Sequence, residues 1–94
     1  MKWVGRQPIL YNKTMTSKDT EYSQDLRSGT TKLLVQCRGQ YDVKLAFAAT
    51  SGTNYLTIKA GSVYYEDIVE GGTRTLYFQC GTDGQVLEII GWIR

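Results

Sequence analysis

The residues of this chain that could carry chemistry are few. Histidine is absent, which removes the side chain most often used for acid–base catalysis near neutral pH and the commonest metal ligand. The two cysteines, Cys37 and Cys80, are too few for a four-cysteine zinc site or a disulfide framework, and both are in phase with apolar neighbours. They are expected to be buried free thiols. We therefore expect no catalytic residue, no metal site, no cofactor and no enzymatic activity.

Acidic residues offer two further candidates. Glu66, Asp67 and Glu70 precede two glycines, but their spacing lacks the alternating oxygen ligands of a calcium loop, so a solvated turn is expected. Glu88 is the one charged residue of an otherwise apolar C-terminal segment. It is expected to pair with a base on a neighbouring strand, either Arg38 or Arg74.

Aromatic residues are the most informative group, with seven tyrosines and two tryptophans among the 94 residues. Alternation places Tyr55 and Tyr77 on the outward side of their segments. Outward aromatics can anchor a protein interface, form a stacking platform for sugars, or stabilise the sheet as cross-strand pairs. Arginine and tyrosine together on a sheet face favour protein contacts over sugar.

Strands are the elements that would position these residues. Glycines recur about every ten residues, and apolar and polar residues alternate between them, as strands joined by turns do. Thr82-Asp83-Gly84 is a strong hairpin signal. Residues 62–70 could instead contain a short helical turn. About eight strands are predicted, near residues 8–15, 21–27, 31–38, 42–49, 53–60, 62–69, 74–80 and 85–93.

Eight short strands in one small domain must close their apolar faces on one another. We predict a single all-β domain over residues 1–94, an antiparallel β-sandwich of jelly-roll type, with a small β-barrel as the alternative. One residue and one segment break the alternation. Leu34 is apolar on an otherwise polar face, and the segment 85–93 is apolar on both faces, which suggests that another layer or subunit covers it.

Charge is low overall and unevenly placed. The net charge of +2 does not indicate nucleic-acid binding, and no apolar run approaches the ~20 residues of a membrane span. No secretion signal is expected. Residues 1–18 contain Lys2, Arg6, Lys13 and Lys18 and no acid. Residues 1–19 could therefore form a basic N-terminal arm, although an edge strand protected by lysines also explains them.

Residues 33–93 resemble small virion-associated proteins of tailed bacteriophages, a family that includes structural, head decoration and cement proteins. The segments that carry the resemblance are residues 34–39, 57–62, 75–79 and 86–92. The last of these is Val86-Leu87-Glu88-Ile89-Ile90-Gly91-Trp92. The resemblance implies a β-rich homodimer or homotrimer that is made in the host cytoplasm. It would bind the major capsid protein on the capsid surface of the virion.

The expected interface combines the basic N-terminal residues with outward aromatics: Trp3, Arg6, Lys13, Tyr55, Tyr77 and Trp92. Two other functions are compatible with the same pattern. One is a carbohydrate-binding module that stacks sugars on tyrosine and tryptophan. The other is a tail or head–tail connector component.

Overall fold

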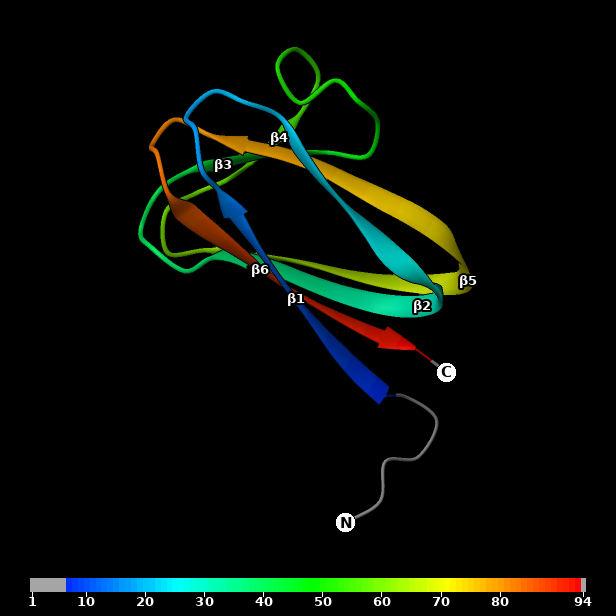
Figure 1. Ribbon diagram of the computed structural model, residues 1–94. Helices are drawn as coiled ribbons and strands as arrows, with labels where there is room; N and C mark the ends of the chain where they lie inside the picture. Colours follow the sequence, from blue (N-terminus) through cyan, green and yellow to red (C-terminus); the bar gives the residue numbers. More distant parts are fainter. Residues whose placement is uncertain (1–6, 94) are drawn as a thin grey trace.

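The computed structural model describes residues 7–93, apart from the side chains of residues 68–73, and these residues form strands joined by turns and loops (Figure 1). All ladders are antiparallel, and the strands are ordered β1-β6-β2-β5-β3-β4. The strand bounds are β1 Gln7–Met15, β2 Tyr22–Cys37, β3 Val43–Ala46, β4 Leu56–Ile58, β5 Val63–Cys80 and β6 Gln85–Ile93.

Two long, bent strands organise the sandwich. β2 has 16 residues and β5 has 18, and both turn back on themselves at the right of Figure 1. Residues 22–26 of β2 pair with 74–78 of β5, whereas residues 32–36 of β2 pair with 63–67 of β5. Each strand therefore contributes one half to each of two layers.

The first layer, here called the β4 layer, contains β4, β3, the second half of β5 and the first half of β2. The second, the β1 layer, contains the first half of β5, the second half of β2, β6 and β1. In chain order the eight segments pair first with eighth, second with seventh, third with sixth and fourth with fifth. This winding is that of a jelly roll, and it confirms the predicted fold.

The number of strands differs from the prediction for a local reason. The breaks expected near residues 28–30 and 70–73 are bends within continuous strands, so about eight predicted strands become six. In β2 the bend contains Gly29, with φ of +91°, and register shifts between Leu26 and Lys32. Glycine accommodates a positive φ in a bulge as readily as in a turn. The expectation of a helical turn within residues 62–70 is wrong, because this segment lies in β5.

The core fills the space between the two layers and contains most of the apolar phase predicted for the segments, although Phe47 is exposed. Phe78 is fully buried, and so are Leu33 and Val35 of β2 and Leu76 of β5. Cys80 is buried and Cys37 is half-buried, both as free thiols, and burial raises the pKa of Cys37. The fully buried apolar side chains are Met15, Leu33, Val35, Val43, Leu45, Leu76, Phe78, Leu87 and Ile89.

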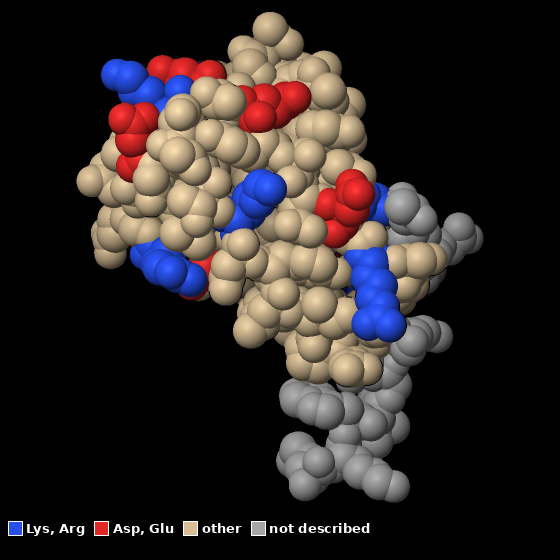
Figure 2. Space-filling model, in the orientation of Figure 1, with Lys and Arg blue, Asp and Glu red and all other residues tan. Residues whose placement is uncertain are grey.

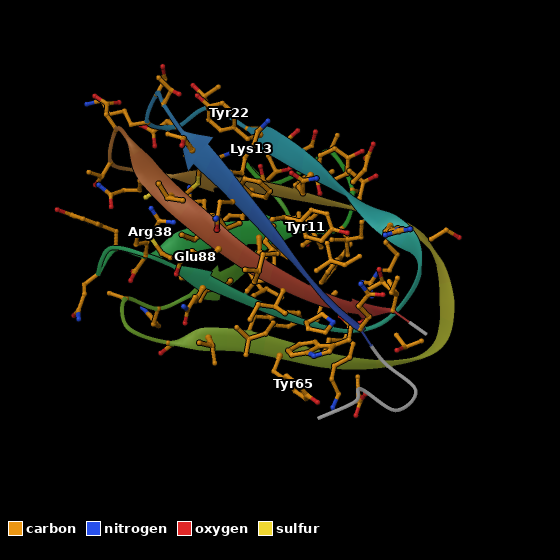
Figure 3. All side chains as sticks on the ribbon, turned by 60° about the horizontal axis from the view of Figure 1, so that its bottom comes forward. Tyr11, Lys13, Tyr22, Arg38, Tyr65 and Glu88 are labelled. Atoms are coloured by element: carbon orange, nitrogen blue, oxygen red, sulfur yellow. The ribbon has the colours of Figure 1, made fainter. Side chains whose placement is uncertain are left out.

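Side chains close the sandwich along its open sides. Within residues 7–93 no ladder joins β1 to β4, the two ends of the strand order. On the side between β1 and β2, the backbone N–H of Arg27 donates to the Tyr11 hydroxyl at 3.0 Å, and that of Ser17 donates to the Tyr22 hydroxyl at 2.9 Å (Figure 3). These tyrosines connect the two layers without a shared backbone ladder.

A turn forms at residues 82–84, but the hairpin predicted there is wrong, because β5 and β6 share no ladder within the described residues and the turn connects the two layers. β5 and β6 are connected by this turn, in which Gly84 has φ of +74° and its N–H donates to the carbonyl of Met15 at 2.8 Å. The Asp83 carboxylate accepts a hydrogen bond from the backbone N–H of Lys18 at 2.6 Å. The turn therefore also fixes the loop that leaves β1.

Substituting Gly84 with alanine tests this turn. Since no atom lies within 4 Å of an added Cβ, only backbone strain opposes the change, and we expect a loss of roughly 1–2 kcal/mol in the free energy of unfolding. Gly52→Ala is the matched control, because its added Cβ would make only an ordinary contact 3.6 Å from Gln79 Nε2. Urea unfolding followed by circular dichroism measures both. Equal stability of the two variants would contradict the strain argument.

Candidate protein interface

The outer face of the β4 layer is partly covered by the chain itself. Residues 47–55 form a loop over this face, at the top of Figure 1. Ser51 in this loop is fully buried, and its hydroxyl donates to the Glu21 carboxylate at 2.6 Å. The Gln79 amide donates in turn to the Ser51 hydroxyl at 3.0 Å, so the loop is fixed to the strand beneath it.

The outer face of the β1 layer presents a row of apolar side chains. Leu10 of β1 is opposite Ile90 of β6, Ile90 is opposite Leu34 of β2, and Leu34 is opposite Tyr65 of β5. Residues opposite one another in antiparallel strands project to the same face. The residues next to them, such as Ile89 and Val35, point into the core. The four side chains therefore form one apolar row across all four strands.

This apolar row is accessible. Leu10 is 69% exposed and Tyr65 is 50% exposed at its two ends, with Ile90 and Leu34 half-buried between them. Val63, 51% exposed, lies on the same face two residues before Tyr65. Isolated apolar residues on a surface need no explanation, but a contiguous group that spans a sheet marks a binding surface.

An aromatic and a basic residue border the apolar row on one side. Trp92 is opposite both Pro8 and Lys32 on this outer face. The ammonium nitrogen of Lys32 lies 6.0 Å from the centre of the Trp92 ring and 5.5 Å from that of Tyr65. Lysine between two aromatic rings adds cation–π attraction and covers them with its alkyl chain.

A polar network borders the row on the other side. Glu88 accepts hydrogen bonds from Arg38 and from the Gln36 amide, both at 2.9 Å (Figure 3). The hydrogen bond from Arg38, followed by that from Gln36, holds the pKa of Glu88 below its ordinary value. The predicted pairing of Glu88 with Arg38 is therefore confirmed. An apolar centre with aromatic residues and a hydrogen-bonded polar rim is the usual anatomy of a protein interface.

The side chains of the apolar row offer contact surface and few ionisable groups. Among the described residues, no group of three or more cysteines or acids could hold a metal ion. Acidic and basic side chains are interspersed over the face of the molecule shown in Figure 2. The row itself contains no ionisable group except the exposed Tyr65 hydroxyl.

The predicted interface residues do not gather on one surface. Trp92 borders the apolar row, but Lys13 is opposite the buried Leu87 and lies on the inner side of β1. Tyr55 and Tyr77 belong to the β4 layer, where Lys44 lies 4.9 Å from the centre of the Tyr55 ring. Trp3 and Arg6 lie outside the described residues. Residues 7–15 of the expected basic arm form edge strand β1, the alternative explanation of its lysines.

Four residues of the face are absent from the predicted interface: Leu10, Leu34, Tyr65 and Ile90. Two signals were available in the sequence. Leu34 broke the alternation of its strand, and the final strand was apolar on both sides, which includes Ile90. Leu10 and Tyr65 had no local signal, because only the strand pairing brings them into the row.

A second cluster of ionisable residues lies on the opposite open side of the sandwich. Arg74 forms an ion pair with Glu66 across the bend of β5, and the Tyr64 hydroxyl donates to the same carboxylate at 2.6 Å. Arg74 also lies 4.9 Å from the centre of the Phe47 ring. The expected solvated turn at Glu66 and Asp67 is therefore wrong, because both belong to β5 and Glu66 ties its two halves together.

These contacts shift both pKa values in the cluster. Burial and the hydrogen bond to Glu66 raise the pKa of Tyr64 to about 12. Burial alone would raise the pKa of Glu66, but the hydrogen bonds from Arg74 and Tyr64, together with the Arg74 charge, outweigh it and lower that pKa. Glu66 is therefore ionised in the folded protein at neutral pH.

Comparisons with known proteins bear on the fold alone. No protein-family model and no curated protein sequence matches the chain. A solution NMR structure of a de novo designed double-stranded β-helix is similar, with a TM-score of 0.52 and 14% sequence identity, over 93% of this chain and 96% of the designed one. Double-stranded β-helix is another name for the jelly-roll winding described above. No helix in the described residues is long and apolar enough to cross a membrane.

The Glu66 ion pair predicts how stability depends on pH. A carboxyl whose pKa is lowered by folding contributes stability above its unfolded pKa and loses it as the pH falls through the folded value. We expect the free energy of unfolding of the unmodified protein to fall below about pH 4.5. Glu66→Gln should be less stable at pH 7 and show a flatter acid limb in urea unfolding. An acid limb identical to that of the unmodified protein would contradict the role of this pair.

Proposed function

We propose that this chain is a non-enzymatic structural protein of a phage virion. It is a capsid decoration or cement protein that binds the major capsid protein lattice and stabilises the head. The observation that supports this proposal most directly is the apolar row of Leu10, Ile90, Leu34 and Tyr65, flanked by Trp92 and by the Glu88 network. The resemblance of residues 33–93 to small virion proteins supplies the class of partner.

The geometry of the row suits docking on a protein shell. Four neighbouring strands hold its side chains in register, so little conformational freedom is lost when a partner covers them. Tyr65 and Trp92 supply the aromatic anchors that often dominate the binding energy of an interface. Because a capsid lattice offers many identical sites, modest affinity at each one is sufficient when the contacts are multivalent.

The proposal also includes self-association and a location. In it, the chain forms a homodimer or homotrimer on the capsid surface after synthesis in the host cytoplasm. Light scattering measures the molar mass that such an oligomer would have in solution. A tail or connector component would use the same kind of apolar contact, so binding to isolated heads and to isolated tails must be measured separately.

Leu10→Arg tests the apolar row. Leu10 is the most exposed apolar side chain of the row and lies on an edge strand, so the substitution leaves the core unchanged. A charge placed in a desolvated contact should weaken binding by about tenfold or more, equivalent to ~1.4 kcal/mol. Co-sedimentation with empty heads of the phage that carries the gene measures this effect.

Ser23→Arg is the matched control. Ser23 is opposite Tyr77 on the outer face of the β4 layer and is exposed, so it adds the same charge on the other side of the sandwich. It should bind heads as the unmodified protein does. Undiminished binding of Leu10→Arg would overturn the role of the row. Binding to tails but not heads would overturn the decoration function.

A further inference from the structure

A pocket lined largely by polar residues lies on the β4 layer, on the opposite side of the sandwich from the apolar row. Its volume is about 480 Å³, within the ~300–1,000 Å³ range of small-molecule sites. The residues that matter for its chemistry are Asp19, Tyr41, Lys44, Thr57, Lys59 and Gln79. Neither the proposed capsid contact nor the core accounts for this arrangement.

Paired strands form the floor of the pocket. Lys44 of β3 is opposite Thr57 next to it in β4 and opposite Gln79 in β5. These three side chains therefore project from one face of the sheet. Lys59, which directly follows β4, also lines the pocket. The pocket lining thus includes two lysines and a hydroxyl, whereas the buried Gln79 amide donates to Ser51.

The walls of the pocket are fixed by hydrogen bonds. The Asp42 carboxylate accepts from the backbone N–H of Ala60 at 2.7 Å, which holds the loop that carries Tyr41. The backbone N–H of Asp19 donates to the carbonyl of Cys80 at 2.8 Å, and Asp19 has a left-handed φ of +55°. The Tyr41 ring, 45% exposed, and the Asp19 carboxylate are therefore held at the rim of a preformed site.

This combination of groups matches the two-sided chemistry of a sugar. A pyranose ring has an apolar face of C–H groups, which stacks on an aromatic ring, and an edge of hydroxyls, which exchange hydrogen bonds with polar side chains. Tyr41 offers the aromatic surface, while Thr57 and Asp19 offer a hydroxyl and a carboxylate. Pockets that orient small ligands commonly combine apolar area with a few placed polar groups.

The two lysines specify the class of sugar further. Among the described residues, neither Lys44 nor Lys59 takes part in an ion pair, and Lys44 instead lies over the Tyr55 ring. Asp42 lines the same pocket, and its carboxylate accepts a hydrogen bond from the Ala60 N–H. Two lysines that line one sugar-sized pocket supply ammonium groups that would bind a carboxylate of the ligand.

We propose that this pocket binds an acidic saccharide, namely one that contains a uronic acid, without cleaving it. The sugar ring stacks on Tyr41, its carboxylate contacts Lys44 and Lys59, and its hydroxyls contact Thr57 and Asp19. The site lies on the opposite layer from the apolar row. A protein docked through that row would therefore keep this pocket open to solvent, and either property can be present without the other.

Titration calorimetry with a panel of uronic-acid trisaccharides tests the proposal, with trigalacturonate, trimannuronate and triglucuronate as probes and neutral trigalactose as the comparison. We expect saturable binding of at least one acidic trisaccharide that weakens with added salt, and binding of the neutral sugar that is at least about tenfold weaker. Tyr41→Ala and Lys59→Gln should each weaken acidic-sugar binding by about tenfold. Both side chains are exposed, so the fold should persist, which circular dichroism checks.

Tyr65→Ala is the matched control, since it removes an equally exposed tyrosine from the opposite layer. It should leave sugar binding unchanged. The absence of saturable binding across the panel would overturn the site, and so would undiminished binding by Tyr41→Ala. Equal affinity for trigalactose would overturn the assignment to acidic sugars. None of these results bears on binding to heads, which Leu10→Arg tests separately.

Discussion

The continuity of β2 and β5 through both layers is the constraint on which the rest of this structure depends. Leu26 and Leu33 both point into the core although an odd number of positions separates them. In an uninterrupted strand such residues would lie on opposite faces. The register shifts around Gly29 and Thr30 supply the one-residue offset that turns both inward. The jelly-roll winding follows from strands that can bend in this way.

That offset also determines the character of the outer surface. With Leu33 and Val35 facing the core, Leu34 must face outward, where strand pairing aligns it with Ile90 and Tyr65. The β4 layer has the opposite character, because its own loop covers part of its outer side and lysines occupy much of the rest. The two layers of one small domain therefore offer an apolar surface on one side and a polar pocket on the other.

The local sequence pattern predicted well which side of each strand is buried. It predicted poorly which strands pair with one another. Alternation identified which side of each segment is buried, and the Asp83-Gly84 turn was recognised because its signal is contiguous in sequence. A bend at Gly29 could not be distinguished from a turn, since glycine serves both. The apolar row escaped detection because it depends on pairing between Leu10 and Ile90, near opposite ends of the described chain. Alternation predicts that a residue faces outward. It does not predict which residues of the neighbouring strands lie beside it.

The place of β6 between β1 and β2 also has a consequence for biosynthesis. The N-terminus of a nascent chain leaves the ribosome first. Strand β1 therefore has no backbone partner until β6 has been translated. Leu10 and Leu34 come onto a common surface only when Ile90 is inserted between them. The apolar row is thus completed last. A polypeptide that ended before β6 would lack the apolar row.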